Sequence, residues 1–252
     1  MTDALKGLVI GIANEDSIAW ACARAFHDRG ARLIVTYQNE QTRGAVEDLA
    51  ARIGAEQVMP LDVTDHRQMD AVFKTIADKW GRLDFLLHSI AYAPPADLLG
   101  ELTNASGSGF AIAMDVSCHS LIRLAKHARP LMSGGGSILT LSYYGAEKVM
   151  PHYNLMGPVK AALESSVRYL AWELGPSDIR VNALSPGPVR SRVSPHPGRF
   201  DEIMQEDVFR TPLHRAITLE QIGDVAAFMV SPQASGINGQ VIHVDNGFTA
   251  IG

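Results

Sequence analysis

Short apolar segments recur along the chain and alternate with longer segments in which apolar residues return every three or four positions. Several of the short segments are apolar on both faces, as strands buried inside a parallel sheet are. The longer segments have the spacing of helices with one buried face. The predicted strands are Leu8–Ile12, Leu33–Tyr37, Gln57–Leu61, Phe85–His88, Ser137–Leu141, Ile179–Leu184 and Val241–Val244. The predicted helices are Ile18–Arg29, Gln41–Ile53, His66–Trp80, Gly109–Met132, Tyr153–Leu174 and Leu219–Val230.

Strand and helix alternate from one end of the sequence to the other, which predicts right-handed βαβ units. We therefore expect an α/β fold in which a doubly wound, seven-stranded parallel sheet is flanked by helices. No linker, repeat or low-complexity tract divides the sequence, so residues 1–252 are expected to form a single domain. The alternation stops at 188–212, a segment rich in Pro, Arg, Ser and His. Within it we predict a substrate-binding lid at about 192–210, because long segments with little regular structure are often binding loops.

Composition narrows the class of protein. Hydrophobic residues make up 46% and charged residues 19% of the 252 residues, which fits a globular chain and excludes a disordered one. The net charge of −5 argues against nucleic acid as the main partner. Cys22 and Cys118 lie far apart and offer neither a disulfide framework nor a CxxC metal site, which suits the reducing cytoplasm. Neither a signal peptide nor an apolar run of about 18 residues is present, so we expect no metal and no membrane partner.

The first predicted strand leads into a turn with features of a phosphate site. The segment from Gly11 to Ile18 would aim backbone N–H groups and a helix N-terminus at a phosphate, with Ser17 as the N-cap. It is not the full GxGxxG fingerprint, because only Gly11 remains and Ala13 and Ser17 stand for its small partners. An ordinary strand-to-helix turn stays open as the alternative. On the first interpretation the cofactor contacts are Gly11, Ala13, Ser17 and Ile18.

Polar or small residues also follow the second, third and fourth predicted strands. In a Rossmann sheet these positions surround the adenosine half of a dinucleotide. Asp62 could accept a hydrogen bond from the adenine amino group, or it could instead cap the helix His66–Trp80. The candidate cofactor contacts at these strand ends are Gln38, Asp62, Val63, Ser89, Ile90 and Ala91.

The most specific indication of catalytic chemistry comes from three residues, Tyr143, Tyr153 and Lys160. Tyr143 follows the fifth predicted strand, and Tyr153 and Lys160 are seven residues apart, which is two turns of one predicted helix. A lysine ammonium near a phenol favours the phenolate and makes the phenol a better acid. Such a tyrosine can donate to a substrate oxygen that gains negative charge. The alternative is that the tyrosines fill the core and that Lys160 is a solvated surface residue.

A proline-rich turn follows the sixth predicted strand. Pro186 and Pro188 would stiffen it around Gly187, and the free backbone groups of Val189 could pair with a nicotinamide carboxamide. A rigid turn without a ligand is the alternative. The candidate cofactor contacts here are Pro186, Gly187, Val189 and Ser191.

Together these residues resemble the short-chain dehydrogenase/reductase superfamily, and within it the divergent enoyl-(acyl-carrier-protein) reductases of the bacterial NADH type. Ordinary members of the superfamily have Ser-x12-Tyr-x3-Lys, whereas six residues separate Tyr153 from Lys160 and a second tyrosine, Tyr143, precedes Tyr153 by ten positions. The resemblance extends from Leu8 to Phe248. The matching segments are Gly11–Ala19, Thr36–Asn39, His88–Ala93, Leu139–Glu147, Tyr153–Gly157, Lys160, Arg180–Ala183, Gly187–Arg190 and Val244–Phe248.

The resemblance implies an activity and roles for individual residues. NADH would give a hydride to the β-carbon of a trans-2-enoyl thioester on acyl carrier protein, in fatty acid biosynthesis. Tyr153 would hydrogen-bond the thioester carbonyl, Lys160 would bind the nicotinamide ribose, and Tyr143 would line the acyl pocket. The implied substrate contacts are Tyr92, Ala93, Tyr143, Tyr153 and Met156. The family also implies a homotetramer.

Three features depart from the family pattern. Ala91 stands where a glycine is usual, and Pro158 lies inside a predicted helix, where it should face away from Tyr153. The predicted lid is more polar and richer in proline than the usual small, apolar lid. These departures leave open a paralogue with shifted acyl specificity. A carbonyl or alcohol oxidoreductase on the same scaffold is a second alternative, against which the Tyr153–Lys160 spacing and Tyr143 argue. A non-catalytic dinucleotide sensor is a third; it predicts a broken Tyr/Lys pair, whereas both residues are present. We expect NADH rather than NADPH, because no basic residue precedes Arg43 after the second strand.

Overall fold

Parallel strands pair side by side in one central sheet. The computed structural model describes residues 4–151, 153–187, 189, 208–209 and 211–251. Within these residues seven strands are arranged in the order β3-β2-β1-β4-β5-β6-β7, and every pairing is parallel. The strands are β1 (Lys6–Ile10), β2 (Arg32–Tyr37), β3 (Gln57–Pro60), β4 (Phe85–His88), β5 (Gly136–Leu141), β6 (Ile179–Pro186) and β7 (Val241–Val244). The order reverses between β1 and β4, which is where a doubly wound sheet binds its ligand.

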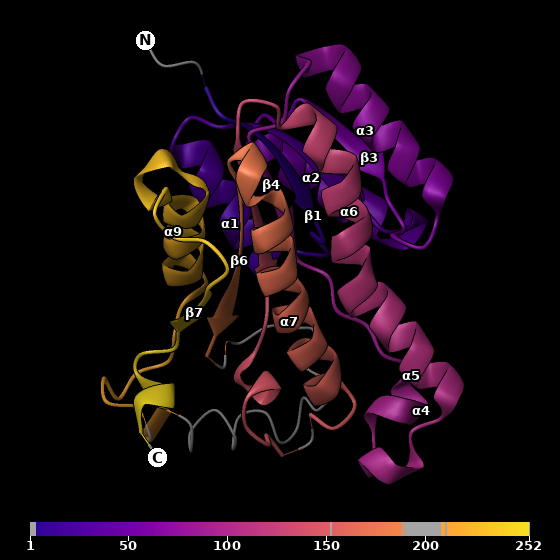
Figure 1. Ribbon diagram of the computed structural model, residues 1–252, viewed down its shortest axis with the longest axis vertical. Helices are drawn as coiled ribbons and strands as arrows, with labels where there is room; N and C mark the ends of the chain where they lie inside the picture. Colours follow the sequence, from indigo (N-terminus) through magenta and orange to yellow (C-terminus); the bar gives the residue numbers. More distant parts are fainter. Residues whose placement is uncertain (1–3, 152, 188, 190–207, 210, 252) are drawn as a thin grey trace.

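Helices cover both faces of the sheet (Figure 1). One apolar layer packs α1 (Ile18–Asp28), α2 (Glu40–Arg52) and α9 (Leu219–Val230) against the strands. The opposite layer is formed by α3 (His66–Trp80), α5 (Gly107–Met114), α6 (Ser120–Ala128) and α7 (Met156–Leu174). Neighbouring residues of one strand, such as Leu8 and Val9, are both fully buried, because each faces a different layer. The predicted doubly wound α/β fold is confirmed.

The long helix predicted over Gly109–Met132 is interrupted by a π-helical turn at Asp115–His119. A side chain of this turn makes hydrogen bonds with the segment that follows β4. The Ser117 hydroxyl accepts from the backbone N–H of Tyr92 at 2.8 Å and donates to its carbonyl at 2.9 Å. The Ser120 hydroxyl, just past the turn, lies 2.8 Å from His88 Nε2. Such π-turns often occur at functional sites, and this one braces the segment after β4. A short helix, α4 (Pro95–Leu98), follows that segment.

The helix that carries Lys160 begins later than predicted. It starts at Met156, so Tyr153 lies in the turn before it, where Asn154 has a φ of 37°. The prediction that Tyr153 and Lys160 share a helical face is therefore wrong. The later start also accounts for Pro158, which lies in the first helical turn, where a backbone N–H has no intrahelical acceptor, so a proline costs little. Pro158 is exposed, but its predicted orientation away from Tyr153 assumed one helix through both residues, and the helix starts after Tyr153.

Candidate active site at the carboxyl edge of the sheet

The ends of β1 and β4 approach each other more closely than a side chain would allow. Gly11 has a φ of +104°, and a Cβ at this position would lie 2.0 Å from the carbonyl oxygen of Ser89. Ser89 in turn donates its N–H to Ile10 at 3.0 Å. Only glycine therefore fits at Gly11, because the backbone of Ser89 fills the space that a side chain would need.

The turn after Gly11 ends in a capped helix. Ser17 Oγ accepts from the backbone N–H of Trp20 at 3.3 Å and donates to the carbonyl of Asn14 at 2.7 Å. The predicted N-cap is confirmed. Ala13 and Ile18 are partly exposed beside this N-terminus, where the helix dipole favours an anion.

The residues predicted around adenosine lie at the same edge. Gln38 is exposed just after β2. Asp62 Oδ1 accepts from the N–H and the hydroxyl of Thr64, at 2.8 and 2.7 Å. The cap of α3 is Asp65, so the alternative that Asp62 caps this helix is wrong. Val63 is buried, and its carbonyl accepts from Arg123 at 3.0 Å.

The segment after β4 presents some of its side chains and buries others. Ile90 is partly buried, whereas Ala91 is exposed and the Tyr92 side chain is 47% exposed. Ala93 is turned into the hydrophobic core, and so is Met156 on α7. Of Tyr92, Ala93 and Met156, which the resemblance implies as substrate contacts, Tyr92 is therefore the one with an accessible side chain.

Tyr143 and Tyr153 contact each other past the end of β5, and Lys160 reaches the last residue of that strand. The two tyrosine rings pack edge to face, with centroids 4.7 Å apart. A Cβ on Gly145 would lie 2.4 Å from Tyr153 Cδ1, so this glycine makes room for the ring. The buried Lys160 Nζ donates to the carbonyl of Leu141 at 2.7 Å.

Burial is the largest influence on the pKa values of Lys160 and Tyr153. Desolvation lowers the pKa of Lys160 to about 8, against the opposing effects of Glu164 and Cys118. Desolvation, together with Tyr143 and Glu164, raises the pKa of Tyr153 above its ordinary value. The expectation that Lys160 favours the phenolate is therefore wrong, because desolvation, Tyr143 and Glu164 all raise the pKa of the phenol. Tyr153 thus keeps its proton at neutral pH and can act as a hydrogen-bond donor.

The structure adds two buried polar groups to the predicted set. Glu164 Oε1 accepts from Ser142 Oγ at 2.5 Å, and burial raises the pKa of its carboxyl group. His88 Nδ1 lies 2.7 Å from Thr140 Oγ1, and burial lowers the pKa of its imidazole to about 3. An acidic residue four positions after Lys160, between the apolar Leu163 and Val167, is the sequence signal that points to Glu164.

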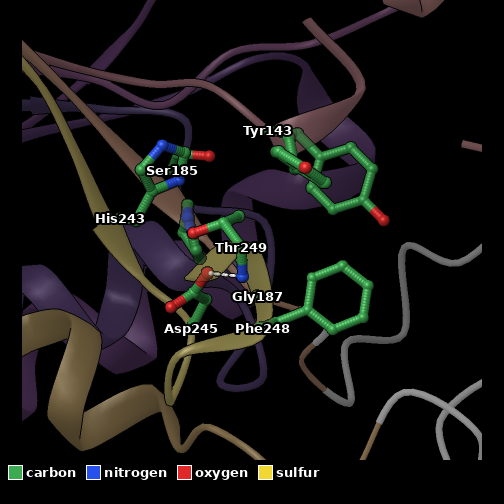
Figure 2. Close-up of a pocket in the computed structure, with 9 residues that line it drawn as sticks. Tyr143, Ser185, Gly187, His243, Asp245, Phe248 and Thr249 are labelled. Atoms are coloured by element: carbon green, nitrogen blue, oxygen red, sulfur yellow. Dashed lines mark hydrogen bonds between the residues drawn. The ribbon is translucent and has the colours of Figure 1, made fainter. Parts of the chain in front are cut away.

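A small pocket lies between the ends of β6 and β7 and the Tyr143 loop (Figure 2). Two of its polar atoms, Ser185 Oγ and His243 Nδ1, are buried and have no hydrogen-bond partner among the described residues. His243 Nε2 lies 3.3 Å from a carboxylate oxygen of Glu147, just after the tyrosine loop. The pocket is lined by Tyr143, Tyr144, Ser185, Pro186, Gly187, His243, Asp245, Phe248 and Thr249.

Part of the predicted site lies beyond the described residues. Val189 is described and partly buried, whereas Ser191 falls outside. The predicted lid at about 192–210 also falls outside, apart from Val208 and Phe209. No helix in the described ranges is long and apolar enough to span a membrane. The same residues contain no group of three or more His, Cys, Asp or Glu side chains arranged to hold a metal.

Comparisons with known proteins identify the family of this chain. The family model described as enoyl-(acyl carrier protein) reductase matches residues 11–249. Enoyl-(acyl-carrier-protein) reductase (NADH) 1 of Rhizobium meliloti is 44% identical, over 98% of this chain and 91% of its own. The enoyl-(acyl-carrier-protein) reductase (NADH) of Aquifex aeolicus is 43% identical, over 100% of this chain and 94% of its own.

A solved structure has nearly the same fold. The reductase from Anaplasma phagocytophilum in complex with NAD has a TM-score of 0.96 and 44% identity, covering 99% of this chain and 95% of that one. An enoyl-acyl carrier protein reductase from Bacillus cereus with NADP⁺ and an indole naphthyridinone also has a TM-score of 0.96, with 43% identity, covering 98% and 97%. The chain belongs to the enoyl-(acyl carrier protein) reductase family.

Proposed function

We propose that this protein reduces the trans-2 double bond of an enoyl thioester on acyl carrier protein in fatty acid biosynthesis, with NADH as the reductant. The observation that carries the proposal is the ring contact of Tyr143 with Tyr153 past the end of β5, together with the hydrogen bond that holds Lys160 to the last residue of the same strand. The relatives named NADH-dependent enoyl reductases match nearly the whole chain, which supports the same chemistry here.

The carboxyl edge of the sheet fits a dinucleotide. Gly11 lies against Ser89 at the β1/β4 switch point, and the capped N-terminus of α1 follows it at the same edge. Lys160 uses one of its three N–H donors on Leu141, and the described part of the chain supplies no second acceptor. The remaining donors suit ribose hydroxyls. We assign Gly11, Ala13, Ser17, Ile18, Gln38, Asp62, Val63, Ser89, Ile90, Ala91, Lys160, Pro186, Gly187, Val189 and Ser191 to the cofactor.

NADH supplies the hydride, which adds to the β-carbon of the substrate. The π electrons of the double bond then move toward the thioester oxygen, where the Tyr153 O–H stabilises the resulting enolate. A proton added at the α-carbon completes the saturated thioester. Lys160 orients the ribose, and Tyr143 and Tyr92 line the path of the acyl group.

Oxidation of NADH by crotonyl thioester, measured beside simple ketones and alcohols, tests the proposed reaction. We expect turnover with the thioester and little with the ketones. Efficient turnover of ketones, with none for the thioester, would instead identify a carbonyl oxidoreductase on the same scaffold. NADH binding without turnover of either class would identify a dinucleotide sensor.

We also propose a homotetramer, formed by one-domain subunits in the cytoplasm. Exposed aromatic and aliphatic side chains on α7 and α5 support the assembly: Tyr169 is 75%, Trp172 82% and Phe110 41% exposed. The free, buried Cys22 and Cys118 suit a reducing compartment. Light scattering after gel filtration measures the mass, and Trp172→Glu is expected to lower it. An unchanged tetramer would place the interface elsewhere.

A further inference from the structure

The end of β5 holds two oppositely charged side chains of α7 through adjacent residues. Leu141 accepts from Lys160 Nζ with its carbonyl at 2.7 Å, and Ser142 donates its hydroxyl to Glu164 at 2.5 Å. Lys160 and Glu164 are one helical turn apart and are both buried, at 4% and 6% exposure. The cation and the carboxylate are therefore fixed on the same side of α7, where water does not screen them.

Of the groups that favour the charged form of Lys160, Glu164 has the largest effect. Burial lowers the pKa of Lys160 to about 8, whereas Glu164, followed by Cys118, opposes this effect. His88 faces Lys160 from β4, but its own burial keeps its imidazole neutral. The other charged or titratable groups that act on Glu164 are Glu147, Arg168 and His243, and Glu164 itself acts on Tyr153.

We propose that Glu164 is a positioning residue that keeps Lys160 protonated and directed at the cofactor ribose, a role that rests on the proposed function. Without the charge of Glu164, Cys118 is what remains, among the described residues, of the groups that favour the buried ammonium. The ammonium then loses its proton within the working pH range, and with it donors that the ribose needs. Glu164 touches neither substrate nor cofactor in this role and acts through Lys160.

The test is the pH dependence of NADH affinity, measured by fluorescence titration. In the wild type we expect affinity to fall with a midpoint near the pKa of Lys160, about 8. Glu164→Gln keeps the shape of the side chain and an oxygen that accepts from Ser142, but removes the charge. Its midpoint is expected to move down by about one pH unit, a tenfold change in the proton affinity of Lys160. Glu164→Asp restores the charge and is expected to move the midpoint back.

Two controls separate this role from a structural one. Glu173→Gln makes the same charge change on the same helix at a 61% exposed side chain, and it should leave the midpoint in place. Lys160→Arg replaces the titrating group with one that stays charged, so the fall near that pH should disappear, with or without Glu164→Gln. A Glu164→Gln protein with lower thermal stability but an unshifted midpoint would overturn the proposal.

If Glu164→Gln does not fold, Ser142→Ala replaces it. This variant removes the hydrogen bond that favours the carboxylate, and it should move the midpoint in the same direction by a smaller amount; no movement counts against the proposal. Reduction of crotonyl thioester by the wild type is measured in parallel. Intact NADH binding without reduction contradicts the proposed function alone, whereas an unshifted midpoint with intact reduction contradicts the role of Glu164 alone.

Discussion

The ring of Tyr143 lies edge to face against the ring of Tyr153, with their centroids 4.7 Å apart and their planes at 63°. Tyr143 follows β5, and Tyr153 lies in the turn before α7, so the contact joins two separate elements. Gly145 lies against the same two rings, since a Cβ added there would be 2.4 Å from Tyr153 Cδ1 and 3.2 Å from Tyr143 Cδ1. The hydroxyl of Tyr153 and the placement of its ring can therefore be tested separately.

Removal of the Tyr153 hydroxyl should lower turnover without loosening the cofactor. Tyr153→Phe keeps the ring and its contact with Tyr143, but it removes the donor to the developing oxyanion. One such donor contributes about 3 kcal/mol, so kcat should fall roughly a hundredfold while the Kd of NADH changes little. Tyr143→Phe is the matched control and should have a smaller effect on kcat. Unchanged turnover in Tyr153→Phe would remove this residue from the mechanism.

A methyl group at Gly145 should displace the catalytic ring. The added Cβ of Gly145→Ala would overlap Tyr153 Cδ1, so the ring has to move. We expect kcat with crotonyl thioester to fall about tenfold or more, since small misplacements of a catalytic group are costly. Gly134→Ala is the control, because nothing lies within 4 Å of the added methyl group there. Equal kcat values for the two variants would contradict the placement of Tyr153.

Cofactor choice should depend on the partners of Arg43. Its Nε donates to Glu47 at 2.8 Å, its Nη1 lies 3.4 Å from Glu40, and its guanidinium lies over the ring of Tyr37. With Arg43 so engaged, we expect kcat/KM to favour NADH over NADPH by about tenfold, or about 1.4 kcal/mol. Glu40→Gln together with Glu47→Gln should raise kcat/KM for NADPH several-fold.

Arg43→Gln in that double variant should abolish the gain with NADPH, since the gain requires the freed guanidinium. Asp78→Asn breaks a comparable exposed pair with Lys74 on α3 and serves as the control. A wild type that uses NADPH at least as efficiently as NADH would show that the acidic partners do not restrain Arg43.

His88 should make the fold sensitive to acid. Its imidazole takes up a proton near pH 6.5 in the unfolded chain, but only near pH 3 when buried. Between these values the unfolded state binds more protons, so the free energy of unfolding falls as the pH falls. At pH 5 the free energy of unfolding should be about 2 kcal/mol lower because of His88 than it is well above pH 6.5. Urea unfolding at pH 7 and pH 5 measures it.

His88→Gln should lessen the difference between the two pH values, whereas replacement of the exposed His27 should not. The same difference in wild type and His88→Gln would assign the acid sensitivity to other groups.

Sequence patterning predicted β4, β7, α3 and α9 to the residue, because each is a continuous apolar or amphipathic segment with clear breaks on both sides. The start of β1 at Lys6 was not predictable in this way. There the backbone N–H donates to Asp84, a residue distant in sequence. The π-turn depends likewise on contacts between Ser117 and Tyr92 that no local pattern contains.

In the candidate site, too, some features could be predicted from the sequence and others depend on tertiary contacts. Tyr143, Tyr153 and Lys160 were predictable because parallel strands bring their carboxyl ends to one edge. The direction in which the pKa of Tyr153 shifts could not be predicted, because it depends on how much water the folded chain excludes. The pairing of Glu164 with Ser142 needed the register between β5 and α7, which spacing along the sequence does not give.

The placement of β1 between β2 and β4 has a consequence for folding kinetics. Gly11 and Ser89 become neighbours only when β4 pairs with β1, which lie three crossover connections apart in the chain, and Tyr153 and Lys160 follow later still. Such non-local pairing is slow compared with the formation of helices. During refolding, helical circular dichroism should therefore return before the protein can bind a dinucleotide. A nascent chain that has not yet produced Tyr153 holds the phosphate turn but not the phenol, and it reaches no partial activity on the way.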